Sequence, residues 1–198
     1  MGIWDNLFGK KNKASPERSP YLPAKKDIVE IEFAKSFTQK GGRFLFCETA
    51  ENTKENLKEI CIENQIDTTE LACFNPLLSQ NFSLNCIDKV SGKLTGFKAA
   101  FIECEYLISN TGKILLSEFQ IKHFKLSELP KIIIVKATIN QLVRDVSQGM
   151  TALKNKYSDA IPTNITTLNI KADHEGEEFK SEVPSTLSKS IYLLLEDN

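Results

Sequence analysis

Two carboxylates, Glu103 and Glu105, stand two residues apart in an apolar stretch that runs from residue 99 to residue 108. Side chains two apart on a strand point to the same face, so a strand here would present both carboxylates side by side. Two carboxylates on one strand face beside a tight turn are unusual for a purely structural hairpin, and positioned carboxylates can serve general acid–base chemistry. The pattern also fits an edge ribbon with a solvated acidic face, and the residue types alone favour this structural interpretation.

A tight turn follows the carboxylates. Residues 110–113 read Asn-Thr-Gly-Lys and separate the first apolar run from a second one at 114–116. Glycine after Asn or Thr between two β-rich runs predicts a hairpin, because glycine accepts the positive φ that such a turn requires. We therefore expect a hairpin within residues 97–118, with Gly112 at φ > 0.

The elements that must position these residues begin near Asp27. Asp27 and Glu30 form a capping-box pattern, which predicts the start of a helix, and Gly41-Gly42 predicts its end. Three further elements follow: a strand at 44–47, a helix opening at Asn52, and a strand at 71–74. This alternation of helices and strands predicts a parallel sheet covered by helices.

The second half of the chain continues the alternation. The β-branched run 132–135 predicts an interior parallel strand, because both of its faces are apolar. Thr138 and Gln141 form another capping-box pattern, which predicts a helix from Thr138 to Leu153. Gly149 within that helix indicates the close approach of a neighbouring backbone. Two more strands are expected, at 165–170 and 191–195.

Size and composition narrow the classes of function. A chain of 198 residues suits one large domain, and a net charge of −1 argues against duplex nucleic acid as a partner. No apolar run approaches the roughly 20 residues of a transmembrane segment, and the start of the chain lacks the features of a secretory signal. We therefore expect a cytoplasmic protein.

No motif in the sequence indicates a metal site or an activated nucleophile. The five cysteines include no C-x-x-C pair, so we expect neither a zinc site nor a cluster bound by this chain. Residues 173–178 crowd acidic groups and His174 together, but the periodless segment 171–183 is more typical of a solvated loop. His123 lies among lysines and fits a surface position. Nucleophile-elbow, P-loop and dinucleotide fingerprints are missing from the sequence.

The first 26 residues differ from the rest. They contain six basic and two acidic residues and three X-Pro pairs, which favour extended backbone. Ile3, Trp4, Leu7 and Phe8 have helical spacing ahead of the lysines. We interpret residues 1–26 as a mobile tail or a protein contact and residues 27–198 as one α/β domain. A firm membrane anchor is disfavoured, because one or two helical turns bury little apolar surface.

The turn and its flanks resemble the LUD-domain family of lactate-utilisation proteins, the LutC/YkgG type. An acidic residue, an apolar pair and a Thr-Gly turn before a hydrophobic run are the family's signature, matched here by Glu105, Ile108 and Thr111-Gly112. The resemblance continues through Leu129-Pro130 and the strand after it. It extends to residues 162–164 and the final strand, and so covers most of the chain after Lys26.

The resemblance implies an open α/β fold of the NagB/RpiA/CoA-transferase-like type, with three layers and helices on both faces of a mostly parallel sheet. In such folds a site lies at the carboxyl ends of the strands. The implied ligand-binding residues are Asn110, Thr111, Gly112, Lys136, Thr138 and Asn164, with Glu105 as the implied acid or base. Lys136 and the N-terminus of the helix capped by Thr138 would together hold an anion.

This chain also departs from the family pattern. Lys113 stands where the family usually has Thr, and Lys131 where it has His before a strand. Two later family segments are reduced here to Ala172-Asp173 and Val183-Pro184. If those segments form the family's ligand site, this chain binds something else or nothing.

Three hypotheses of function remain open. The first is a LUD-domain subunit that holds an anion or docks a partner in an organic-acid oxidation system, with no cofactor of its own beside an iron–sulfur oxidoreductase subunit. The second is an enzyme of the same fold type acting on a sugar phosphate, folate or acyl-CoA. The third is a structural domain with a degenerate site. The sequence does not decide whether the chain is an enzyme, but it pairs no base with a nucleophile, which favours the first and third hypotheses.

Deletion of residues 1–25 should leave the domain folded, because this segment has no core periodicity beyond Phe8. Thermal unfolding of the full chain and the truncated chain, followed by circular dichroism, tests this. A midpoint lowered by more than about 8 °C would correspond to well over 1 kcal/mol and would show that the tail belongs to the core.

Overall fold

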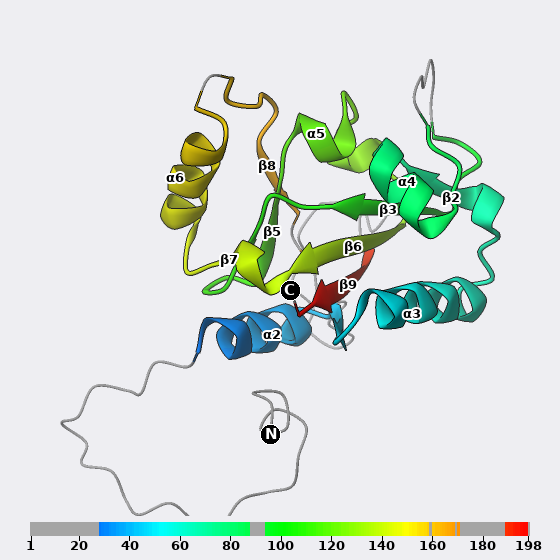
Figure 1. Cartoon of the computed structure of the whole chain (residues 1–198), viewed down its shortest axis with the longest axis horizontal. Helices are drawn as coiled ribbons and strands as arrows, with labels where there is room; N and C mark the ends of the chain where they lie inside the picture. Colours follow the sequence, from blue (N-terminus) through cyan, green and yellow to red (C-terminus); the bar gives the residue numbers. More distant parts are fainter. Residues whose placement is uncertain (1–27, 88–93, 159, 169, 171–188, 198) are drawn as a thin grey trace, which may run out of the picture.

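The structure is a computed structural model that describes residues 28–87, 94–158, 160–168, 170 and 189–197. Its centre is a five-stranded sheet in the order β1-β9-β6-β3-β2, in which every neighbouring pair is parallel (Figure 1). The strands are β1 (Arg43–Cys47), β2 (Leu71–Cys73), β3 (Ala99–Glu103), β6 (Ile132–Thr138) and β9 (Ser190–Glu196). The predicted α/β fold with a mostly parallel sheet is confirmed.

The two longest strands lie in the middle of this sheet. β6 pairs with β9 over seven registered residues and with β3 on its other side. Ile133, Ile134 and Val135 are completely buried, although successive side chains point to opposite faces. A strand buried on both faces requires an unbroken apolar run, which is how the sequence identified it.

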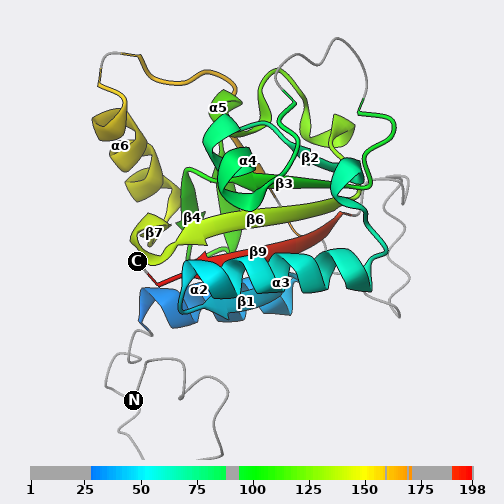
Figure 2. The ribbon, with the colours of Figure 1, turned by 45° about the vertical axis from the view of Figure 1, so that its right-hand side comes forward.

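Helices cover both faces of the sheet (Figure 2). α3 (Ala50–Glu63) and α4 (Pro76–Phe82) lie on one face, and α2 (Val29–Gln39) lies on the other. α2 is held by two fully buried rings, Phe33 and Phe37, whose centroids stack 5.4 Å apart. Among the helices of the described segments, none is long and apolar enough to cross a membrane.

A second sheet, which we did not predict, packs beside α2. Its strand order is β7-β4-β5-β8, and it mixes parallel and antiparallel pairs. The strands are β4 (Tyr106–Ile108), β5 (Lys113–Leu116), β7 (Leu142–Val143) and β8 (Thr166–Leu168). One face contributes Leu107 and Ile114 to the main core, and α6 (Val146–Lys156) packs against the other face through Leu153. Gly149 of α6 lies close to this sheet, since a Cβ there would be 3.4 Å from Val143.

The second sheet corrects the prediction of one strand over residues 99–108. β3 ends at Glu103 in the main sheet, and β4 starts at Tyr106 in the second. Glu103 and Glu105 therefore do not share the face of one strand. Glu105 lies at the junction between the two sheets.

Three helix predictions also need correction. The capping pattern at Thr138 begins only a 3-10 turn, η3 (Ile139–Gln141), and β7 then intervenes before α6, which Asp145 caps. α3 begins at Ala50 rather than at Asn52, because the Thr49 hydroxyl accepts a hydrogen bond from the Asn52 amide. α4 was missed, since Pro76 starts this helix instead of only ending the strand before it.

Three other short elements complete the described chain: η1 (Thr68–Glu70), α5 (Glu118–Ile121) and η2 (Leu126–Glu128). The predicted tail 1–26, the cap at Asp27 and the acidic loop 171–183 lie outside the described residues.

The predicted hairpin is confirmed, and its turn is docked on α2. β4 and β5 pair antiparallel around the turn, where Gly112 has φ = 58°. A Cβ on Gly112 would lie 2.6 Å from the backbone of α2 at Ser36 and Phe37. The Lys40 ammonium, just after α2, donates a hydrogen bond to the Thr111 carbonyl. The turn therefore serves as a contact between the second sheet and α2.

Gly112→Val should destabilise the fold by at least about 1–3 kcal/mol, because it combines a left-handed backbone with a backbone clash. Thr111→Val is the matched control. The Thr111 hydroxyl has no hydrogen-bond partner in the part of the chain that the structure describes, so its loss should cost less than about 0.5 kcal/mol. Urea unfolding of both variants measures the difference, and equal losses would contradict the assignment of the contact to Gly112.

Candidate functional site

A polar pocket of about 280 Å³ lies where β2, β3 and β6 end. Asn75 follows β2, Glu103 ends β3, and Lys136 lies near the end of β6; all three line the pocket. Lys156 and Tyr157, at the end of α6, form another part of its wall. The pocket therefore occupies the carboxyl edge of a parallel sheet, the position at which open α/β folds bind ligands.

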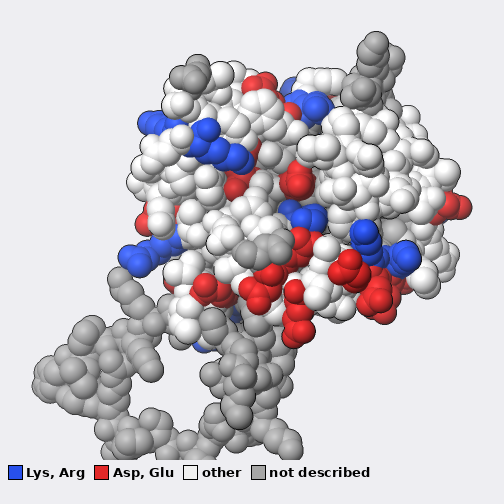
Figure 3. Space-filling model, viewed as in Figure 1, with Lys and Arg blue, Asp and Glu red and all other residues white. Residues whose placement is uncertain are grey.

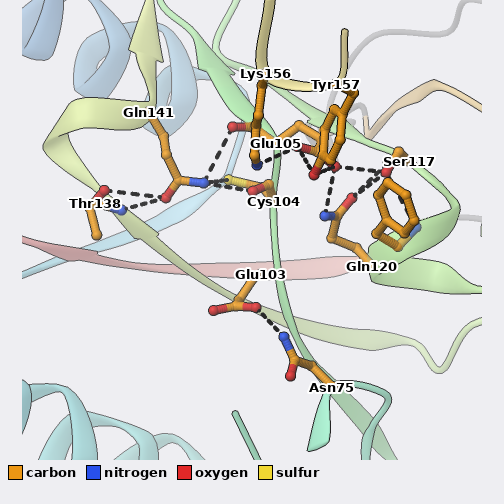
Figure 4. A network of polar contacts seen from close by, with 11 residues as sticks. Asn75, Glu103, Cys104, Glu105, Ser117, Gln120, Thr138, Gln141, Lys156 and Tyr157 are labelled. Carbon is orange, nitrogen blue, oxygen red and sulfur yellow. Dashed lines mark hydrogen bonds and ion pairs between the residues drawn. The ribbon is translucent and has the colours of Figure 1, made fainter. Parts of the chain in front are cut away.

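The Glu105 carboxylate lies behind this pocket, with its side chain completely buried. One oxygen accepts hydrogen bonds from the Ser117 hydroxyl at 2.7 Å and the Gln120 amide at 2.9 Å. The other accepts from the Lys156 ammonium at 2.9 Å, and the Tyr157 hydroxyl lies 3.2 and 3.3 Å from the two oxygens. Figure 4 shows these four side chains pointing toward Glu105. One carboxylate thus joins α5 and α6 to the junction of the two sheets.

Two glutamines are oriented by capping boxes. The side-chain oxygen of Gln120 accepts from the Ser117 backbone amide, and that of Gln141 accepts from the Thr138 amide. Because each oxygen is occupied, each amino group is free to donate elsewhere. Gln120 donates to Glu105, and Gln141 donates to the Cys104 carbonyl at 2.6 Å. Both side chains also line the pocket.

The pKa values follow from these contacts. Burial alone would raise the pKa of Glu105, but hydrogen bonds from Gln120, Lys156 and Ser117 outweigh burial and lower it. Burial would likewise lower the pKa of Lys156, and its hydrogen bond to Glu105 raises it instead. Glu105 and Lys156 therefore form an ion pair at neutral pH.

A second ion pair lies across the pocket. The Lys136 ammonium is 2.8 Å from the Glu196 carboxylate, and both side chains are largely buried. Glu103 is directly opposite Lys136 in the register of β3 and β6. Its carboxylate accepts a hydrogen bond from the Asn75 amide at 2.6 Å (Figure 4).

The site lacks an activated nucleophile among the residues that line it. The Cys104 thiol is buried, and burial together with the charges of Glu105 and Glu103 raises its pKa strongly. Within the described ranges, no three His, Cys, Asp or Glu side chains come together in a way that would hold a metal ion.

The structure separates the residues that the sequence proposed for a site. Lys136 and Thr138 line the pocket, and Glu105 lies directly behind it. Asn110, Thr111 and Gly112 lie in the hairpin turn, and Asn164 precedes β8; these four do not line the pocket. The sequence predicted an anion site at the N-terminus of an α-helix capped by Thr138. Thr138 instead caps a three-residue 3-10 turn, so no α-helix begins there.

The sequence did not predict most of the residues that line the pocket. Asn75, Gln120, Gln141, Lys156 and Tyr157 were not proposed as site residues. The capping-box spacing of the two glutamines was a usable local signal, since such a residue follows a strand end at the carboxyl edge. Lys156 and Tyr157 gave no local signal, because they reach Glu105 across about fifty residues of sequence.

Glu105→Gln should lower stability at pH 7 by on the order of 1–3 kcal/mol, because the Lys156 ammonium loses its charged partner. The free energy of unfolding of this variant should also change less with pH in the acid range. The folded-state pKa of Glu105 is depressed, so the wild type loses this contribution as pH falls from about 4.3 through the folded value. Urea unfolding between about pH 7 and pH 3 measures both effects. Glu59→Gln, at an exposed position of α3, should behave as wild type. If the unfolding free energies of Glu105→Gln and the wild type had the same pH dependence in acid, the stabilising role of the charged Glu105 would be contradicted.

Comparisons with known proteins agree with this architecture. The profile of the LUD domain matches residues 80–184, just over half of the chain, including Glu103, Glu105 and Lys156. The crystal structure of a DUF162 family protein from Deinococcus radiodurans superposes with a TM-score of 0.61, covering 85% of this chain and 96% of that one. At 15% identity, this likeness concerns the fold alone. No curated protein matches the chain. The extent of the profile match shows that the chain belongs to the LUD-domain family.

Proposed function

We propose that this LUD-domain chain binds a small organic anion in the carboxyl-edge pocket. The supporting observation is the pair of lysines there, each fixed by a buried carboxylate at 2.8–2.9 Å. The Lys156 side chain is 48% exposed, and its ammonium donates a hydrogen bond to Glu105 and also interacts with Tyr157. An ammonium carries three donors, so N–H groups remain for a ligand carboxylate. The amide of Gln120 and the hydroxyl of Tyr157 are held beside it.

The size of the pocket sets the ligand class. Pockets for drug-sized ligands usually measure about 300–1,000 Å³, so a volume of about 280 Å³ suits a small acid better than a nucleotide or acyl-CoA. Figure 3 shows that basic side chains on this face are interspersed with acidic ones and form no continuous basic surface. A small carboxylate fits such a site better than a polyanion does.

In this proposal the chain is the non-cluster subunit of a cytoplasmic system that oxidises lactate or a related organic acid. The chain contributes the anion site or a docking surface, and an iron–sulfur partner subunit carries the redox centres. Family membership supports this role.

The alternative is an enzyme that acts on a sugar phosphate, folate or acyl-CoA with Glu105 as acid or base. The geometry supports it less well. Both oxygens of Glu105 are occupied by protein donors, and its depressed pKa makes it a weak base. A positioning role, in which Glu105 fixes Lys156 and Tyr157, suits this carboxylate better.

Calorimetric titration with lactate, propionate, succinate and inorganic phosphate tests the proposal. Lys156→Met should weaken carboxylate binding at least about tenfold, which corresponds to 1.4 kcal/mol. Lys154→Met removes the other lysine of the last turn of α6, which does not line the pocket, and should bind as wild type. Equal binding by both variants, or no carboxylate binding by the wild type, would contradict the proposal.

A further inference from the structure

The charges around the pocket are unevenly paired. Three carboxylates, those of Glu103, Glu105 and Glu196, accompany the two ammonium groups of Lys136 and Lys156. The lysines are each neutralised within 2.9 Å by Glu196 and Glu105. Glu103 is therefore the remaining charge, so the pocket without a ligand has an excess negative charge on one wall.

Glu103 is held in place but not neutralised. Its carboxylate accepts from the neutral Asn75 amide at 2.6 Å. Lys136 is opposite to it in the β-ladder, yet the Lys136 ammonium pairs with Glu196. Within the described segments, Glu103 has no salt bridge to a lysine, arginine or histidine. Its side chain is half-buried and lines the pocket, where it can accept from a bound molecule.

Asn75 makes this arrangement rigid. Its side-chain oxygen accepts from the amides of Leu77 and Leu78 and so caps α4, which leaves its amino group directed at Glu103. The amide cannot turn over without breaking the cap. Glu103 thus presents an oriented carboxylate in the same pocket as the donors of Lys156.

Building on the proposed anion site, we propose that the ligand is a small zwitterion of the amino-acid class. Its carboxylate lies on the Lys156 side of the pocket, and its ammonium group pairs with Glu103. The ligand ammonium then pairs with the carboxylate that has no cationic partner among the described residues, and the ligand carboxylate takes the remaining donors of Lys156. A hydroxy acid or oxo acid of the same length offers Glu103 a neutral donor or none, and a charge-assisted hydrogen bond is about twice as strong as a neutral one.

The three-carbon acids alanine, lactate and pyruvate test this directly, because they share a carboxylate and differ in the group on the second carbon. Calorimetric titration of the full chain at neutral pH should show alanine binding at least about tenfold more tightly than lactate or pyruvate. Glu103→Gln should remove that preference by weakening alanine binding, and its affinity for lactate should be no weaker than that of the wild type, because the variant lacks the carboxylate charge that repels an anion. Glu59→Gln, exposed on α3, is the control and should keep the preference.

Each outcome separates the two proposals. If lactate or pyruvate binds as tightly as alanine, the zwitterion is wrong and the anion site stands. Retention of the alanine preference by Glu103→Gln also overturns the zwitterion. If none of the three acids binds the wild type, the anion site itself is wrong. Lactate binding by Glu103→Gln shows that the variant is folded. If Glu103→Gln does not fold, Glu103→Asp is measured instead; it keeps the charge and should keep the preference for alanine.

Discussion

A buried carboxylate cannot remain charged without donors, and this constraint at Glu105 organises the junction between the two sheets and the helices α5 and α6 beside it. Moving an ion out of water costs several kcal/mol unless hydrogen bonds replace its hydration. Ser117 and Gln120 bring α5 to the carboxylate, and Lys156 and Tyr157 bring the end of α6. The same carboxylate therefore fixes the junction between the two sheets, the end of α6 and one wall of the pocket. Any change that loosens α6 also loosens the lysine that we propose for ligand binding.

The hairpin turn performs the corresponding task on the other side of the second sheet. Gly112 allows the turn to approach the α2 backbone, and Lys40, the residue that caps the end of α2, donates a hydrogen bond to the turn. The Thr-Gly pair that suggested a ligand site is thus explained by a contact between elements. We propose that ligand binding is carried instead by residues at the ends of β3 and β6, where the chain leaves the main sheet.

The sequence was informative where local chemistry determines structure. The interior strand at 132–135 and the positive φ of Gly112 were predicted, because burial on both faces and turn geometry each leave a local pattern. The division of residues 99–108 between two sheets was not, because an apolar run does not show where its pairing partner changes. The capping pattern at Thr138 misled for a related reason, since a 3-10 turn and an α-helix begin with the same cap. The contact between Lys156 and Glu105 exists only after folding brings the end of α6 to the sheet junction, so no local pattern in the sequence could predict it.

In this proposal, different residues around the pocket bind the ligand and discriminate between ligands. Lys136 and Lys156 are fixed and neutralised by carboxylates of the protein, so they supply directed donors without a strong attraction for any anion. Their contribution is nearly the same for every small carboxylate. A group whose charge the protein leaves unbalanced is better placed to discriminate, because its interaction energy differs most between a charged and a neutral group on the ligand. Glu103, fixed by the Asn75 amide and facing the pocket, is the residue that meets this condition.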